Sequence, residues 1–179
     1  MNNNPRCICC FGSQFENLYY GRDGGLIKKC CNCGLISTEG GKKRTVSFDY
    51  YDKTYYTQHH NEAKNRKTMW KNRFQQLKKF CRRGSLLDVG CGLGDFAAIA
   101  KNNGWDVAAT EISGYAQEHV LKNTGIDVIH GEIGNVDFGS RKFDVVTMWH
   151  VLEHMGDPLK AIKIAHSLLK EGGLLVVEV

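Results

Sequence analysis

Apolar and polar residues in the second half of the chain follow the spacing of alternating strands and helices. Short, almost unbroken apolar runs at 86–89, 143–148 and 174–179 have the length of strands that are buried on both faces. Residues 106–110 form a further predicted strand, and a helix pattern over 95–101 lies between it and the first run. This alternation predicts an α/β fold with a doubly wound, parallel sheet.

A glycine-rich turn follows the first predicted strand. Its glycines are Gly90, Gly92 and Gly94. Without side chains, they let a ligand approach the backbone closely. A dinucleotide fingerprint needs Gly or Ala where Asp95 stands, which disfavours NAD. Asp88 before the turn suits a cationic ligand, and Glu111 at the end of the next strand is placed to accept both ribose hydroxyls of an adenosine. These features favour a nucleoside that carries a positive centre.

Two cysteine pairs near the start have the spacing of a structural zinc site. Cys7 and Cys10 form one CxxC pair, and Cys30 and Cys33 form a second pair after 19 intervening residues. Each pair brings two sulfurs to one side of a tetrahedral ion. Four thiolates leave no open coordination position, so we expect the Zn²⁺ to be structural and not catalytic.

The surroundings of these pairs leave the exact ligands open. Cys9 and Cys31 adjoin the pairs and are alternative ligands, and a set of reduced thiols without metal is the alternative to a zinc site. Residues 18–20 and 26–29 flank a turn at 23–25, which predicts a short hairpin. So small a hairpin cannot bury enough surface to fold alone, and a metal would supply the missing stability.

A connecting segment, residues 46–83, begins with a tyrosine-rich stretch and continues as a predicted basic amphipathic helix over 61–83. The apolar stripe of this helix consists of Trp70, Phe74, Leu77 and Cys81, widened by Met69 and Phe80. The other faces are rich in lysine and arginine. They are either solvated or a phosphate-binding surface.

Composition and charge limit the class of protein. With 42% hydrophobic and 24% charged residues, the chain has an ordinary globular composition. Residues 1–83 carry a net charge of +11 and residues 84–179 a net charge of −6, which indicates two units and makes an anionic partner plausible for the first. No long apolar run or secretion signal is present, so we expect no membrane span and a cytoplasmic protein. In that compartment, the 8 cysteines are expected to be metal ligands, core residues or free thiols.

Five motifs follow one another in the second half of the chain. They are the segments 88–94, 111–113, 131–132, 143–154 and 169–179. In this order they resemble the successive motifs of class I S-adenosylmethionine-dependent methyltransferases. With the CxxC pairs and the tyrosine-rich segment before them, the chain is similar to the branch that contains sugar-nucleotide C-methyltransferases. The resemblance implies a zinc ribbon over 1–45 and a Rossmann-like, S-adenosylmethionine-binding core over 84–179.

The resemblance also implies the cofactor contacts. They are Asp88, Gly90, Cys91, Gly92, Gly94, Glu111, Ile112, Glu132, Trp149 and His150. The glycine turn would line the methionine moiety, with Asp88 at its ammonium group. Glu111 would bind the ribose, Ile112 would pack on the adenine and Glu132 would face the adenine amino group. Trp149 and His150 would border the reacting methyl group. By analogy, Tyr50, Tyr51, Tyr55 and Tyr56 would close over the cofactor; an aromatic packing patch is the alternative.

The pentad from His150 to His154 has the form H-x-x-E-H, which is also the inverted zinc-protease motif. On a helix, His150 and His154 would grip a metal while Glu153 activates water. The strand directly before the pentad favours a different setting, the end of a strand in a nucleotide-binding sheet. There His150 and His154 are candidate bases for an oxygen or carbon acid, with Glu153 adding polarity. A structural histidine pair is the remaining alternative.

The implied family core has seven strands, and the sequence accounts for five. We expect the strand at 174–179 to lie at an exposed edge, where it self-associates or is covered by another chain, unless the polypeptide has been shortened. The expected function is in-line methyl transfer to a small-molecule acceptor, for example a sugar nucleotide. The alternatives are an RNA methyltransferase whose ribbon and basic helix hold phosphates, and a non-catalytic cofactor-binding fragment.

Overall fold

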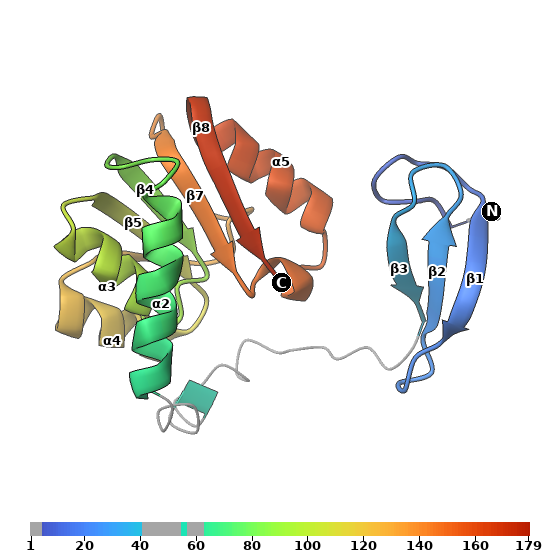
Figure 1. Cartoon of the computed structure of the whole chain (residues 1–179), viewed down its shortest axis with the longest axis horizontal. Helices are drawn as coiled ribbons and strands as arrows, with labels where there is room; N and C mark the ends of the chain where they lie inside the picture. Colours follow the sequence, from blue (N-terminus) through green and yellow to red (C-terminus); the bar gives the residue numbers. More distant parts are fainter. Residues whose placement is uncertain (1–4, 41–54, 57–62) are drawn as a thin grey trace. The chain divides into compact units, whose positions relative to one another are not determined.

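The computed structural model describes residues 5–40, 55–56 and 63–179. The chain divides into two units, Met1–Thr45 and Val46–Val179 (Figure 1). Among the described helices, none has both the length and the apolar content that a membrane crossing needs. Two of the four tyrosines expected near the cofactor, Tyr50 and Tyr51, lie outside the described residues.

The first unit is a three-stranded antiparallel sheet in the order β1-β2-β3. Its strands are β1 (Phe15–Tyr20), β2 (Leu26–Cys30) and β3 (Ile36–Glu39). The predicted hairpin at 23–25 is confirmed, whereas β3 was not predicted. Over residues 5–40 only Cys7, Gly25, Lys28 and Cys30 are buried. This sheet therefore has almost no hydrophobic core, and it needs another source of stability.

The second unit contains a five-stranded sheet in the order β6-β5-β4-β7-β8, in which every neighbouring pair is parallel. The strands are β4 (Ser85–Val89), β5 (Asp106–Glu111), β6 (Val128–His130), β7 (Phe143–Trp149) and β8 (Leu169–Glu178). The doubly wound α/β fold expected from the sequence is confirmed. The carboxyl ends of β4, β5 and β7 lie side by side at one edge, where such sheets bind ligands.

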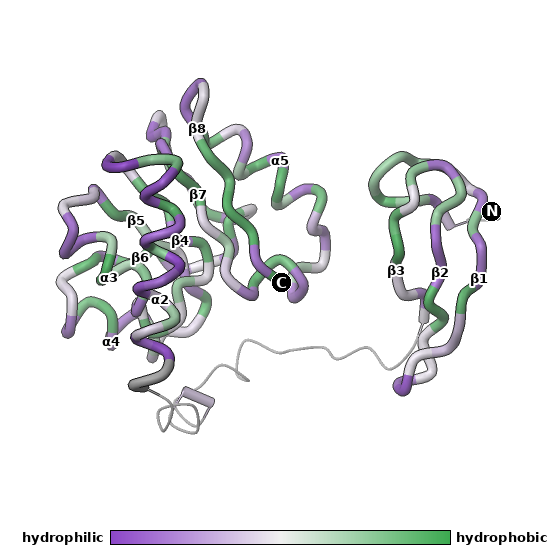
Figure 2. Tube along the Cα trace, viewed as in Figure 1, coloured by the Kyte–Doolittle hydropathy of each residue, from purple (hydrophilic) through white to green (hydrophobic). Residues whose placement is uncertain are grey.

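Helices cover both faces of this sheet. They are α2 (Ala63–Leu77), α3 (Asp95–Asn102), α4 (Gly114–Thr124) and α5 (Pro158–Leu168), with a short 3-10 helix η3 (Leu152–His154) after β7. Helix α2 crosses in front of the sheet in Figure 1 and is largely hydrophilic, against hydrophobic strands, in Figure 2. Along β7, Val145 packs on the α2 and α3 side, whereas Val146 and Met148 pack on the α5 side. This alternation is the period of two that a strand imposes.

Helix α2 is held by an aromatic cluster. Phe74 and Leu77 are buried, and Phe74 makes edge contacts with Phe96 of α3 and with Trp105, at centroid distances of 6.2 Å in both cases. The predicted helix is too long, since α2 ends at Leu77 and Phe80 is 78% exposed. The chain must leave the helix there because β4 begins only eight residues later.

We predict that Phe74→Ala lowers the free energy of unfolding by about 3–5 kcal/mol, because it leaves a cavity among Leu86, Phe96 and Trp105. Denaturant unfolding followed by tryptophan fluorescence measures the change. Phe80→Ala, at an exposed site four residues before Gly84, is the matched control and should change the stability by less than about 0.5 kcal/mol. Equal losses for the two variants would contradict the assignment of Phe74 to the core.

Candidate active site and candidate metal centre

A cleft of about 330 Å³ opens at the carboxyl ends of the parallel strands. Residues that directly follow β4, β5, β6 and β7 line it together with side chains of the connecting segment. The predicted site residues in its lining are Asp88, Gly90, Cys91, Gly92, Glu111, Ile112, Glu132, Trp149, His150 and His154. Gly94 and Glu153 do not line it. Strand ends that are far apart in sequence therefore converge as the topology requires.

The glycine turn adopts backbone conformations that side chains disfavour. Gly90 and Gly92 have φ values of +64° and +54°. A Cβ atom on Gly90 would lie 2.7 Å from Val151 Cγ2, so this position admits no larger residue without movement. At Gly94 a Cβ would lie 2.8 Å from Val120 Cγ2, which shows that this glycine allows α3 to approach α4. The packing of α3 against α4 thus requires a glycine at position 94, whether or not this residue contacts a ligand.

Glu111 is 5% exposed and accepts hydrogen bonds from three backbone amides. Its Oε2 accepts from the Gly92 amide at 2.9 Å, and its Oε1 accepts from the Ile112 and Ser113 amides at 2.8 and 2.9 Å. A carboxylate has about four acceptor positions, so capacity remains for a hydroxyl donor from a ligand. Because one of the three amides belongs to Gly92, Glu111 also fixes the glycine turn.

Asp88 lies beside Glu111 and is almost fully buried, with 1% of its surface exposed. Burial raises the pKa of Asp88 to about 7, the hydrogen bond from Thr147 opposes this rise, and the negative charge of Glu111 adds to it. The Thr147 hydroxyl donates to Asp88 Oδ1 at 2.7 Å. Burial and the two carboxylates likewise keep the pKa of the Cys91 thiol well above its ordinary value, so this thiol stays protonated.

The electrostatics of the cleft therefore favour a cation at this end. Two buried carboxylates meet at the glycine turn, and the basic side chains in the described lining are Arg66, His150 and His154. Arg66 itself pairs with Asp95, with Nε to Oδ2 at 3.5 Å. A ligand with an ammonium or sulfonium group fits this environment, whereas a pyrophosphate would meet like charge.

Two tyrosines of the connecting segment, Tyr55 and Tyr56, line the same cleft. Tyr56 is buried and stacks on Tyr115 of α4, with ring centroids 6.1 Å apart, while Tyr55 meets it edge-on at 5.1 Å. The Tyr56 ring also lies next to Gly92, 3.7 Å from the position of a Cβ there. These aromatic side chains reduce the access of water to the glycine turn.

The pentad from His150 to His154 does not form a helix. His150 has a φ of +54°, and only Leu152–His154 form a short 3-10 turn. The inverted zinc-protease interpretation is therefore wrong, because it needs both histidines on one helix. His150 lies outside the 3-10 turn, and its backbone is in the left-handed region. His150 Nδ1 lies 3.6 Å from Glu153 Oε1, so Glu153 faces His150 from outside the cleft lining.

Sequence reasoning missed several residues around His150. Arg66 and Trp70 of α2 line the cleft, and Arg73 of α2 forms hydrogen bonds to Glu178 of β8. Trp70 had been expected only as part of a packing stripe, and its helical spacing is indeed that of a core residue. No sequence signal connects Arg73 with Glu178, because the two residues are 105 positions apart.

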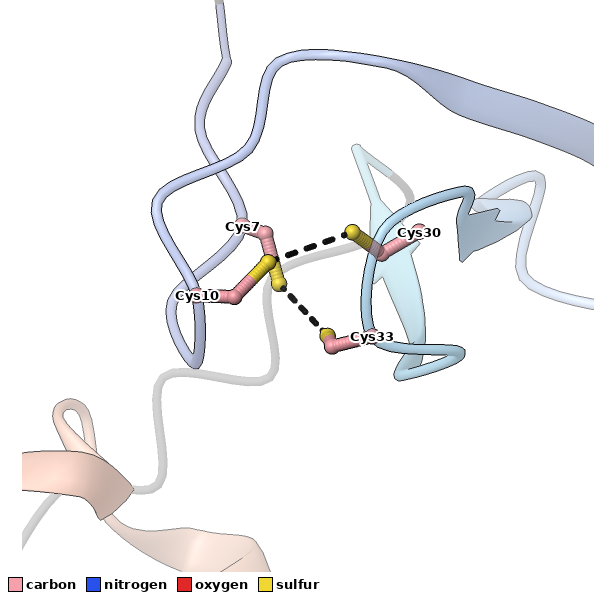
Figure 3. Close-up of side chains that lie close together, drawn as sticks. All are labelled: Cys7, Cys10, Cys30 and Cys33. Atoms are coloured by element: carbon pink, nitrogen blue, oxygen red, sulfur yellow. Dashed lines mark hydrogen bonds between the residues drawn. The ribbon is translucent and has the colours of Figure 1, made fainter.

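The four predicted zinc ligands converge at one end of the first unit (Figure 3). The Sγ atoms of Cys7, Cys10, Cys30 and Cys33 all lie within 4.8 Å of one another. The Cys7–Cys33 and Cys10–Cys30 sulfur pairs are each 3.5 Å apart. A tetrahedral zinc ion with bonds of about 2.3 Å would hold its sulfurs about 3.8 Å apart, so the donor set fits this ion. The alternative ligands, Cys9 and Cys31, are exposed and lie outside the cluster.

The thiols of the cluster do not share one affinity for protons. Hydrogen bonds from the Asn32 side chain and the Gly12 backbone lower the pKa of Cys10 to about 6. The backbone of Leu35 lowers the pKa of Cys33, but burial and the neighbouring thiols outweigh it and raise that pKa to about 12. Cys10 therefore loses its proton more readily than Cys33, and a metal would have to displace the proton of Cys33.

The parallel sheet and the acidic cleft at its carboxyl edge define the class I fold of S-adenosylmethionine-dependent methyltransferases. The sequence comparison agrees, since the family described as "Methyltransferase domain" matches residues 58–179, more than half of the chain. The chain therefore belongs to this methyltransferase family. The resemblance inferred from the five motifs is confirmed.

Individual relatives cover parts of this region. The ubiquinone biosynthesis O-methyltransferase of Paraburkholderia phymatum is 35% identical over 95 residues, which are 49% of this chain and 40% of that protein. The sugar N-methyltransferase KedS8 of a Streptoalloteichus species superposes with a TM-score of 0.51 and 26% identity, over 57% of this chain and 44% of that one. CalS10, a SAM-bound amino pentose methyltransferase of Micromonospora echinaspora, has a TM-score of 0.60 and 21% identity, over 70% and 56% of the two chains. The chain spans less than half the length of the curated relative.

We predict that Asp88→Asn stabilises the unit in a pH-dependent manner. The pKa of Asp88 is raised to about 7, so its protonated form stabilises the folded state at low pH, and this contribution is lost as the pH rises from about 4 to about 7. The increase in the free energy of unfolding that Asn brings should therefore grow between about pH 4 and about pH 7 and stay constant at higher pH. Chemical denaturation at pH 5 and pH 8 measures it, with Asp106→Asn at an exposed position as control. A gain of equal size at both pH values would contradict the raised pKa of the buried Asp88.

Proposed function

We propose that the unit 46–179 binds S-adenosylmethionine in the cleft and transfers its methyl group to a small-molecule acceptor. The observation that carries this proposal is the pair of buried carboxylates, Asp88 and Glu111, at a glycine turn with little room for side chains. When bound, S-adenosylmethionine supplies a methyl group on a positively charged sulfur, which is an activated leaving group. The protein must then orient the reactants and exclude water.

The residues of the cleft divide these tasks. Asp88 would hold the ammonium group, and Glu111 would accept one ribose hydroxyl at its remaining acceptor position. Ile112 would pack against the adenine, with Glu132 at its amino group. Tyr55 and Tyr56 would shield the turn from water. Correct orientation alone contributes about 7–11 kcal/mol to the lowering of a bimolecular barrier.

His150 would take a proton from an acceptor that is not nucleophilic in its neutral form. It lines the cleft at the end of β7, beside Trp149, and half of its side chain is exposed. His154 lines the same cleft and is the second candidate base. A nitrogen acceptor would need neither residue.

A small-molecule acceptor is better supported than RNA. The described part of the ribbon, residues 5–40, carries four basic and three acidic residues, so it offers no strongly basic face for phosphates. The relatives named above are described as acting in ubiquinone biosynthesis or on sugars. A sugar nucleotide remains one candidate among such acceptors, and its phosphates would have to lie near Arg66, His150 or His154, the basic side chains of the described lining.

We also propose that Cys7, Cys10, Cys30 and Cys33 hold one structural Zn²⁺. The four sulfurs fit a tetrahedral ion, and the ribbon buries only four of the residues 5–40, so metal binding would supply the missing folding free energy. Such a site is closed, and it would take no part in methyl transfer.

We expect the purified full chain to contain about one zinc per molecule by elemental analysis, because a single four-thiolate cluster holds one ion. Cys30→Ser should lose the metal and the ordered signals of the ribbon in an NMR spectrum. Cys31→Ser, at the exposed neighbouring thiol, is the matched control and should keep both. An ordered ribbon in metal-free protein would overturn the proposal.

Substitution of Glu111 tests the methyltransferase proposal. Glu111→Ala should weaken binding of S-adenosylmethionine by about 1–3 kcal/mol, which is about 5- to 150-fold in Kd, because a charged hydrogen-bond acceptor is lost. Titration calorimetry measures it, and Glu118→Ala, at an exposed glutamate of α4, should bind like the wild type. Failure of the wild-type chain to bind millimolar S-adenosylmethionine would refute the proposed function, and unchanged affinity in Glu111→Ala would refute the role of Glu111.

A further inference from the structure

Glu178 of β8 holds both the backbone and the ring of His150. The Glu178 carbonyl accepts the His150 amide hydrogen at 2.7 Å, and Glu178 Oε1 lies 3.1 Å from His150 Nε2. His150 has a φ of +54°, which is uncommon for a residue with a side chain and persists only where neighbouring contacts enforce it. Such enforced conformations cluster at functional sites. The contacts from Glu178 supply the enforcement here.

Arg73 of α2 in turn fixes Glu178. Its Nε donates to Glu178 Oε2 at 2.8 Å, and its Nη2 donates to Glu178 Oε1, so the pair is bidentate. The guanidinium lies 4.6 Å from the ring centroid of Trp70 and 5.4 Å from that of Trp149. Arg73 is therefore itself restrained by two aromatic faces.

We propose that Glu178, held by Arg73, is a positioning residue for His150. It would keep the Nε2–H of the imidazole directed at its own carboxylate, so that Nδ1, which lies 3.6 Å from Glu153 Oε1, is the nitrogen that receives a proton. A carboxylate that orients a histidine base in this way is a recurring arrangement in enzymes. The inference rests on the proposed function, and it narrows the acceptor to an oxygen or carbon acid, because an amine needs no such base.

For a hydroxyl acceptor, the hydroxyl proton moves to His150 Nδ1. The electron pair of the acceptor oxygen forms the new bond to the methyl carbon, and the carbon–sulfur bond breaks with its electron pair on sulfur. The proton then leaves Nδ1 for water. Among the residues that the structure describes, the charged groups that face the ring are Glu178, Arg73, whose Nη2 is 3.4 Å from Nε2, and Glu153, whose Oε1 is 3.6 Å from Nδ1. The two carboxylates would stabilise the imidazolium that forms.

The test is an NMR titration of the full chain with ¹⁵N-labelled histidine rings, with the His150 signals assigned by their absence in His150→Gln. Glu178→Gln removes one facing negative charge and should move the protonation midpoint of His150 down by about one pH unit. Arg73→Gln leaves Glu178 without its cationic partner and should move the midpoint up. Glu171→Gln, at an exposed glutamate of the same strand, should leave it unchanged.

Opposite shifts in Glu178→Gln and Arg73→Gln would support the proposal, because a general loosening of the structure would not change sign. Any other combination overturns it. Calorimetry with S-adenosylmethionine on the same samples separates this inference from the proposed function, since Glu178→Gln should bind the cofactor within about twofold of the wild type, about 0.4 kcal/mol. A wild-type chain that binds no S-adenosylmethionine would refute the function and leave the titration result standing.

Discussion

A single buried carboxylate organises the cleft. Glu111 accepts hydrogen bonds from the amides of Gly92, Ile112 and Ser113, so the end of β5 and the turn after β4 are fixed to each other. Its charge also contributes to the raised pKa of Asp88. Shape and charge of the binding site thus come from the same side chain. A ligand with a positive charge would relieve the electrostatic repulsion between Asp88 and Glu111.

The second constraint lies on the opposite side of the cleft, where β7 ends. His150 occupies a backbone conformation that its own sequence does not favour, and its surroundings come from α2 and β8. The two sides differ in origin. The Glu111 network joins residues at most 19 positions apart, whereas the Arg73–Glu178 pair joins residues 105 positions apart.

This difference explains what the sequence could predict. The strand that contains Asp88, the glycine turn and the position of Glu111 follow from local patterns, and so do the two CxxC pairs and the hairpin between them. The end of α2 at Leu77 was missed because the apolar spacing continues through Phe80 and Cys81, and only the nearby start of β4 ends the helix. The left-handed His150 and its partner Glu178 follow from tertiary contacts that no local pattern encodes. The same holds for the β3 strand, which a short polar segment gives little reason to expect.

Helix α2 has a consequence for how this protein can be divided. It comes from the connecting segment, yet Phe74 and Leu77 fill the core beneath it, and Trp70 lines the cleft. A shortened protein that begins at β4 and lacks α2 would expose Phe96, Trp105 and Trp149 to water as one aromatic surface. Such a surface favours aggregation. The ribbon can therefore be removed or replaced only by a cut before α2. The helix must stay with the unit whose cleft it lines.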